Sequence, residues 1–418
     1  MAAMDNLNEE RPTFVTHLEC SLTGEHYAAD VVQGLSREGR PLLVRYDLEA
    51  LAASLSREDL ERRPTDFWRY REFLPVREAS NIVSLGEGMT PVQPAPRVQE
   101  RMHGGLVTIK DEGRLPTGSF KARGLALAVS MAKELGLRKL AIPTNGNAGA
   151  AMAAYGRRAG MEVFVFCPED TPETNLREIA MQGARVWRVN GLIHDCGRIV
   201  REGVESMGWF DVSTLKEPYR IEGKKTMGLE LAEQFGWKLP DVIFYPTGGG
   251  TGLIGMVKAF DELEAIGWLG SKRPRMVAVQ ASGCAPIVKA WKEGREHAEE
   301  WKNAHTVAAG IRVPVAVGDF LILRGIRSTN GFATAVDDAA IEEARAEMAE
   351  LEGILLCPEG AATYAAYKKE LASGRVGAEE SVVLFNCATG LKYDMPPVTE
   401  ALDCRQPIDY AALARAGS

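Results

Sequence analysis

The residues of this chain with the clearest chemical potential are 116–124, PTGSFKARG, where one lysine follows a turn of small residues. Lys121 stands just before the apolar stretch 125–135, so we expect it at the beginning of a helix. An amine whose pKa is lowered by burial can act as a nucleophile toward an aldehyde and as a base. The glycines and Ser119 would let a phosphate or backbone approach closely. The alternative is an ordinary helix N-terminus capped by Ser119, and three later loops favour imine chemistry.

Residues 143–149, PTNGNAG, form the first of these loops, between a predicted strand and an Ala-rich helix. Backbone amides around Thr144 and Asn145 could bind a substrate carboxylate with help from the helix N-terminus. The side chain of Asn147 could reach a ring hydroxyl. Asparagine is also a common helix N-cap, so this segment alone leaves both interpretations open.

Residues 247–252, TGGGTG, follow an apolar strand and precede a helix. Residues without side chains let several amides point at one phosphate, and the helix dipole favours the negative charge. The segment does not match the dinucleotide pattern G-x-G-x-x-G, and no Gly-Lys-Ser/Thr of a P-loop occurs. We therefore predict a phosphate site formed by Gly248, Gly249, Gly250, Thr251 and Gly252.

Residues 386–392, NCATGLK, come directly after the apolar strand 381–385. Either Cys387 or Thr389 could face a heteroaromatic nitrogen there, and a neutral partner would leave that nitrogen unprotonated. A buried structural cysteine is the alternative. An aldehyde for Lys121, a phosphate and an aromatic nitrogen together point to pyridoxal 5′-phosphate, the electron sink for amino-acid carbanions.

The elements that must position these loops alternate between strand and helix from residue 136 onward. Such alternation predicts an α/β fold of parallel-type sheets flanked by helices, with ligands at the carboxyl ends of the strands. The predicted strands are 139–143, 162–167, 184–189, 242–245, 276–280 and 382–386, and the predicted helices are 147–159, 173–181, 195–207, 253–266, 338–351 and 360–371. A polar connection is expected before residue 242.

Composition limits the classes of function. The 418 residues suffice for two domains, and the formal net charge of −8 gives no support to nucleic-acid binding. No run is long and apolar enough to predict a membrane span, and residues 1–12 do not resemble a secretory signal. The 7 cysteines are dispersed, as is typical of reduced thiols in a cytoplasmic protein.

Residues 1–76 differ from the rest of the chain. Short strands are expected at 13–18 and 42–46, followed by charged helical turns at 56–71. Cys20 begins a possible CxxC knuckle, but Thr23 stands where the second thiol would be, so we expect no metal. A surface extension or dimer arm is the expected role.

The chain resembles the fold-type II pyridoxal-phosphate enzymes, which are tryptophan synthase β-like, and among them the threonine synthases, over residues 84–395. The matching segments are 85–91 (LGEGMTP), 116–121 (PTGSFK), 218–226 (PYRIEGKKT), which is similar to the segment before the large-domain helix, and 390–392 (GLK). The resemblance implies that Lys121 carries the cofactor, Asn147 holds its phenolic oxygen and residues 248–252 hold its phosphate. Residues 1–76 resemble a zinc ribbon whose ligands are lost.

The resemblance also implies an organisation into domains. The large cofactor-binding domain would comprise 77–121 and 211–400, the small mobile domain 122–210, and the tail 401–418. A homodimer is expected.

The implied activity is that of a lyase acting on phosphates, in which O-phospho-L-homoserine and water give L-threonine and phosphate by γ-elimination and β-hydration. Lys121 would remove the α-proton and then move a β-proton, while Arg123, Lys224 and Lys225 are candidate cations for the leaving phosphate. Ala122, the pair Ala148 and Gly149, and Cys387 depart from the threonine synthase pattern. Some serine dehydratases have cysteine at the last position. A threonine or serine ammonia-lyase of the same fold is therefore the alternative. A further alternative is a catalytically inactive relative that binds cofactor or partners through its N-terminal arm.

Overall fold

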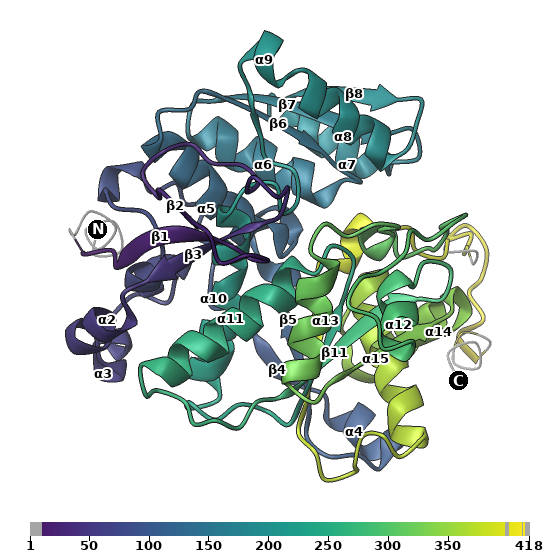
Figure 1. Ribbon diagram of the computed structural model, residues 1–418. Coiled ribbons are helices and arrows are strands. Elements are labelled where there is room, and N and C mark those ends of the chain that lie inside the picture. The colour runs from purple at the N-terminus through teal and green to yellow at the C-terminus, as the bar shows by residue number, and fades with distance from the viewer. Residues whose placement is uncertain (1–10, 398–400, 412, 414–418) are drawn as a thin grey trace.

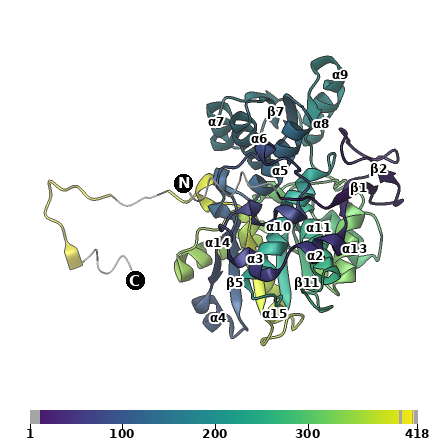
Figure 2. The same cartoon turned by 90° about the vertical axis from the view of Figure 1, so that its left-hand side faces the viewer.

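The computed structural model describes residues 11–397, 401–411 and 413, and two separate sheets of mainly parallel strands dominate it (Figure 1 and Figure 2). The larger sheet has 6 strands in the order β12-β11-β10-β13-β5-β4, and β4 alone pairs antiparallel to its neighbour in this sheet. The α/β class predicted from the sequence is confirmed. The strands are β4 (Val92–Pro94), β5 (Val107–Asp111), β10 (Val242–Pro246), β11 (Arg275–Ala281), β12 (Phe332–Val336) and β13 (Val382–Asn386).

The smaller sheet has 4 parallel strands in the order β8-β7-β6-β9 and lies at the top of Figure 1. Helices join consecutive strands, as parallel pairing requires. The strands are β6 (Lys139–Pro143), β7 (Glu162–Pro168), β8 (Arg185–Val189) and β9 (Phe210–Asp211), and the helices are α6 (Asn147–Arg158), α7 (Glu173–Met181), α8 (Ile193–Glu202) and α9 (Val204–Met207).

Several helices pack around the larger sheet, and the sequence analysis missed α4 (Pro96–Met102), α12 (Pro286–Lys292), α13 (Asp319–Ser328) and the longest of the four, α10 (Tyr219–Gln234). The expected polar connection before residue 242 is wrong, because α10 is a buried helix of 16 residues. The segment 218–226 forms its first half rather than a stretch before it. The other helices are α5 (Lys121–Glu134), α11 (Thr251–Ala265), α14 (Asp338–Glu352) and α15 (Pro358–Ala372).

The N-terminal segment folds as a third, antiparallel sheet of order β2-β1-β3, followed by α2 (Leu48–Ser54) and α3 (Arg57–Glu61). Its strands are β1 (Val15–Cys20), β2 (His26–Tyr27) and β3 (Leu42–Tyr46).

This segment is not the surface extension that we expected. Leu18 and Val44 are fully buried in the hydrophobic cluster that contains α5 and α6, whereas Leu51 and Phe73 lie in the cluster that contains α10 and α11. The hydroxyl of Tyr46 donates to Glu222 Oε2 on α10 at 2.8 Å. Apolar burial on this scale stabilises the fold, so the segment is a packed part of the molecule.

The chain ends are less informative. Residues 1–10, which bear on the expected absence of a secretory signal, lie outside the described residues, as do 398–400, 412 and 414–418 of the predicted large domain and tail. Within the described part, none of the helices combines the length and apolar character needed to cross a membrane. All 7 cysteines are free thiols.

Candidate active site

A cavity of about 560 Å³ opens where strands of both parallel sheets end, next to β6, β10 and β13. This is where ligands bind in open α/β sheets. Most of the site residues proposed from the sequence line it: Lys121, Thr144, Asn145, Asn147, Gly248, Gly249, Gly250, Thr251, Gly252 and Cys387. The remaining five, Ser119, Arg123, Lys224, Lys225 and Thr389, lie outside its lining.

The turn before Lys121 is held against the loop that follows β13. Thr117 and Gly118 both have a φ of 62°, which bends the chain sharply into α5. The Phe120 amide donates to the Cys387 carbonyl at 2.8 Å, and the Thr389 amide donates to the Gly118 carbonyl at 2.9 Å. Two segments far apart in the sequence are thereby fixed side by side, which places Lys121 close to Cys387.

The amine of Lys121 faces the cavity without a carboxylate partner. Its Nζ lies 4.1 Å from the ring centroid of Phe120, and within the described residues it makes no hydrogen bond or ion pair. Loss of solvation lowers the pKa of Lys121 to about 8, and the positive charge of nearby Arg220 adds to the shift. A lysine in this state holds a useful fraction of free amine near neutral pH, which suits a nucleophile and base.

Arg123, a candidate phosphate ligand, is instead locked beneath the cavity. Its guanidinium is fully buried and donates to Glu112 at 2.6 and 2.9 Å and to Glu230 at 2.6 and 2.7 Å. Two bidentate ion pairs use nearly all of its donors. No free charge is left for a ligand of the cavity.

The two candidate lysines of α10 have different surroundings. Lys225 is fully buried between Glu222 at 2.7 Å and Glu262 at 2.8 Å, away from the cavity. Lys224 lies behind Phe120: its amine donates to the Phe120 carbonyl and sits 4.1 Å from the ring centroid. Burial, together with the positive charge of Lys121, lowers the pKa of Lys224. Neither amine reaches the cavity.

The glycine-rich turn between β10 and α11 packs closely against neighbouring side chains and contributes backbone to the cavity wall. Gly250 has a φ of 74°, and a Cβ there would lie 2.2 Å from Ile322. A Cβ at Gly252 would lie 1.9 Å from the Tyr245 hydroxyl. In the described structure no side chain caps the start of α11. Its first amides therefore stay available for an anion in the cavity.

The loop after β6 presents Asn147 in the opposite wall. The Asn147 Nδ2 donates to the Tyr393 hydroxyl at 3.2 Å, and Lys392 Nζ donates to Asn147 Oδ1 at 3.4 Å. The hydroxyl of Thr144 accepts from the amides of Gly146 at 3.0 Å and Gly149 at 3.1 Å. The loop is thus braced from within, and its amides at Asn147 and Ala148 form the start of α6.

Two residues that follow β13 have different roles: Cys387 lines the cavity, and Thr389 caps a short turn. Cys387 is buried in the cavity wall, and burial raises its pKa, so its thiol is neutral. The Thr389 hydroxyl instead accepts from the Leu391 amide at 3.4 Å at the start of a short 3-10 turn. Ser119 lies next to Ala388, and its buried hydroxyl has no hydrogen-bond partner among the described residues.

The cavity is also lined by titratable residues that were not chosen from the sequence, among them Arg220. Arg220 belongs to the segment 218–226, yet nothing there distinguished it from its charged neighbours. In the structure its Nη1 donates to the Val212 carbonyl at 2.8 Å, and its buried Nε is unpartnered within the described chain. The others are His194, Arg201, Lys216, Tyr245, Glu359 and Tyr393, which come from separate segments with no shared sequence pattern.

The comparisons with known proteins show the family of this chain. Residues 83–388 match the family described as pyridoxal-phosphate dependent enzyme, so the chain belongs to that family and is a pyridoxal-phosphate-dependent enzyme. Among its relatives, the chain is 33% identical over 374 residues to the threonine synthase of Methanocaldococcus jannaschii, covering 89% of this chain and 92% of the relative. It is 34% identical over 393 residues to that of Methanosarcina acetivorans, covering 94% and 95%.

Solved structures show the same fold at lower identity. Maize serine racemase superposes with a TM-score of 0.62 at 20% identity, covering 79% of this chain and 91% of that one. A threonine deaminase from T.th. also gives a TM-score of 0.62, at 23% identity, covering 74% and 94%. These likenesses support the predicted fold-type II architecture.

Proposed function

We propose that this chain is a threonine synthase, which converts O-phospho-L-homoserine and water to L-threonine and phosphate. The observation that carries the proposal is the unpaired amine of Lys121, which shares one cavity with the uncapped start of α11. The relatives that match nearly the whole chain at 33% and 34% identity are named threonine synthase. The enzyme is accordingly a lyase.

The cavity suits pyridoxal 5′-phosphate on the chemistry of its donors. The open amides of residues 248–252 would hold the phosphate, Asn147 the phenolic oxygen and Lys121 the aldehyde carbon. We assign the contact with the pyridine nitrogen to Cys387 rather than Thr389, because Thr389 lies outside the cavity lining. When bound, the cofactor withdraws electrons from the α-carbon of an amino acid.

Lys121 is the residue that we propose to move protons. Its pKa of about 8 lets it accept a proton from Cα near neutral pH and return it to a neighbouring carbon. Phe120 and Cys387 flank the amine in the cavity wall. One base would thus serve successive proton transfers at Cα and Cβ, with release of phosphate from Cγ and addition of water at Cβ.

The substrate's two anionic groups fit two parts of the wall. The carboxylate would bind at the start of α6, next to Thr144, Asn145 and the amides of Asn147 and Ala148. For the phosphate we propose Arg220 and Lys216, which line the cavity, in place of Arg123, Lys224 and Lys225. Arg220 contributes an unused Nε, and an arginine stays charged even when burial lowers its pKa.

We further propose the domain division expected from the sequence: 77–121 and 211–400 as the large domain, 122–210 as a small mobile domain, and 1–76 and 401–418 as flanking segments. The smaller parallel sheet supports the division, although β9 straddles its boundary at residue 210. A homodimer and a cytoplasmic location are part of the proposal. The free state of all 7 cysteines is consistent with that location.

The test is a substrate panel on the cofactor-loaded enzyme, scored for phosphate, threonine and ammonia. A synthase releases threonine and phosphate in equal amounts from O-phospho-L-homoserine, without ammonia. Ammonia from threonine or serine, with no turnover of the phosphorylated substrate, would establish the ammonia-lyase instead. The variant Lys121→Ala is the control, since any product it still forms arises elsewhere.

A second variant tests the phosphate contact. Arg220→Gln should lower kcat/KM for O-phospho-L-homoserine by at least about tenfold, because a charged hydrogen bond to phosphate is lost. The matched control is Arg177→Gln, an exposed arginine on α7, which should leave the rate unchanged. Equal rates for both variants would remove Arg220 from the proposal.

A further inference from the structure

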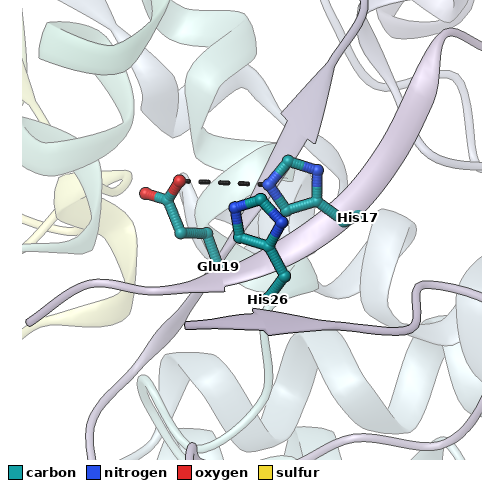
Figure 3. A group of neighbouring side chains, drawn as sticks. All are labelled: His17, Glu19 and His26. Carbon is teal, nitrogen blue, oxygen red and sulfur yellow. Dashed lines mark ion pairs between the residues drawn. The ribbon is translucent and has the colours of Figure 1, made fainter. Parts of the chain in front are cut away.

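We propose that His17, Glu19 and His26 form a binding site for one divalent metal ion of the zinc class on the N-terminal hairpin. Their ligand atoms all lie within 4.8 Å of one another, and Figure 3 shows the three side chains converging on one side of β1 and β2. The site is separate from the cavity and does not rest on the proposed function.

Strand pairing brings the three side chains together. His17 and Glu19 are two apart on β1, so both project from the same face of the strand. In the antiparallel register of β1 and β2, Glu19 lies directly opposite His26, which puts His26 on that face too. The two imidazole rings stack with centroids 3.8 Å apart.

The hydrogen bonds of Thr16 orient His17 as a metal ligand. The Thr16 hydroxyl donates to the Arg45 carbonyl at 3.2 Å and lies 2.9 Å from His17 Nδ1. Because its only proton is used, the hydroxyl accepts from Nδ1–H, which leaves the lone pair on Nε2. This Nε2 is buried and has no hydrogen-bond partner in the described structure. Metal-binding histidines are fixed in the same way, by a hydrogen bond from the other ring nitrogen.

Arg45 orients the carboxylate. Its guanidinium donates twice to Glu19 Oε1, from Nε at 3.1 Å and from Nη2 at 2.6 Å. Glu19 Oε2 is left facing His17 Nε2 at 3.9 Å, too far for a hydrogen bond. One oxygen is thus anchored and the other remains for a ligand. The arginine charge opposes a cation, so we expect moderate affinity.

The distances fit a zinc ion after a small adjustment. Bonds of about 2.0–2.1 Å at tetrahedral angles place ligand atoms about 3.3 Å apart. His26 is exposed, so its ring can rotate to close the remaining gap. Two imidazoles and a carboxylate suit zinc and leave the fourth position to water.

The expectation of no metal rested on Cys20, which takes no part in this site. Cys20 and Leu18 occupy the opposite face of β1, and the buried Cys20 thiol donates to the Ser36 hydroxyl at 3.2 Å. The sequence search looked for a second thiol near Cys20. It could not show that His26 pairs across the hairpin with Glu19.

The experiment is a Zn²⁺ titration of the full-length, cofactor-loaded enzyme after chelation and dialysis, with metal content and calorimetry as readouts. We expect one equivalent per chain. His17→Ala and His26→Ala should each weaken that binding by at least about tenfold. Thr16→Val keeps all three ligands but loses the orienting hydrogen bond, and should weaken it to a smaller degree.

The matched control is His305→Ala, an exposed histidine far along the chain, which should bind Zn²⁺ as the unaltered enzyme does. Circular dichroism and cofactor absorbance establish that each variant is folded. The proposal is overturned if the unaltered enzyme takes up no equivalent of Zn²⁺. It is equally overturned if folded His17→Ala and His26→Ala variants retain full affinity, since the ion is then adventitious only.

Discussion

Two neighbouring regions of this molecule differ in whether their cations are paired with carboxylates. In the cavity wall, Lys121 faces open space without a carboxylate. In the layer beneath, Arg123 is only two residues further along α5 and is held by Glu112 and Glu230. Lys224 and Lys225 repeat the contrast on α10, where Lys225 has two carboxylates and Lys224 only a carbonyl and an aromatic ring.

The contrast distinguishes cations that are able to react from cations that stabilise the fold. A buried cation whose charge is balanced stays protonated and contributes to a fixed arrangement of helices. A buried cation without a counterion gives up its proton more easily, as the lowered pKa of Lys121 shows. For Lys121 and Arg123, proximity in sequence is therefore no guide to role, whereas the presence of a carboxylate is.

The largest expected effect comes from removing the unpaired cation. Lys121→Ala should lower the rate by at least about a thousandfold, since it removes the nucleophile and base, and abolish the bound-cofactor absorbance. The unfolding midpoint should stay close to that of the cofactor-free enzyme, because no ion pair is broken. Lys133→Ala, on the same helix but at the surface, is the matched control. A Lys121→Ala enzyme that keeps its activity would break the comparison.

The next largest effect comes from removing a carboxylate that pairs with buried cations, that of Glu230. Burial alone would raise the pKa of Glu230, but Arg123 and Lys110 lower it to about 2, so it is charged at neutral pH. Glu230→Gln should cost about 3–5 kcal/mol of unfolding free energy, because both cations lose a buried counterion. Chemical denaturation followed by circular dichroism measures the loss.

The control for that variant is Glu173→Gln at the surface of α7, where Glu173 pairs with exposed Arg177 and Arg188. Exposed pairs contribute little to stability, so its denaturation curve should superimpose on that of the unaltered enzyme. Equal destabilisation by both variants would show that burial of the ion pairs is not what matters.

The smallest effect is a dependence on pH. Because the pKa of Lys121 is lowered to about 8, its free amine increases with pH up to that value. The rate of cofactor rebinding by the cofactor-free enzyme should rise about tenfold per pH unit below 8 and level off above it. An ordinary lysine would give a rate that still rises toward its usual pKa.

Glu359 sharpens this measurement, because its negative charge raises the pKa of Lys121. Glu359→Gln should therefore shift the midpoint of the rebinding profile to lower pH. A shift to higher pH would contradict the electrostatic origin that we assign to the lysine's pKa.

The sequence predicted those elements whose apolar pattern is local. The predicted ranges 139–143 and 382–386 coincide with β6 and β13, and 173–181 coincides with α7. The helix α10 was missed because charged residues are spread all around it. Those charges are neutralised by partners on α5, α11 and β5, distant in sequence, so no amphipathic face marks the helix.

Parts of the candidate site could also be predicted from local sequence patterns. The glycine run at 248–252 and the lysine after a small-residue turn are local signals, and the structure places both in one cavity. Which cations face that cavity depends on long-range pairing. Arg123 and Lys225 could not be separated from Arg220 until their carboxylates were located.

The contact between Tyr46 and Glu222 also has a consequence for biosynthesis. The two residues are 176 positions apart, and ribosomes add roughly 5–20 residues per second. At that speed Tyr46 is translated roughly 9–35 s before Glu222. Leu18 and Val44 pack in the cluster that contains α5 and α6, which are translated earlier, so the contact with α10 is a late step in the packing of the first sheet.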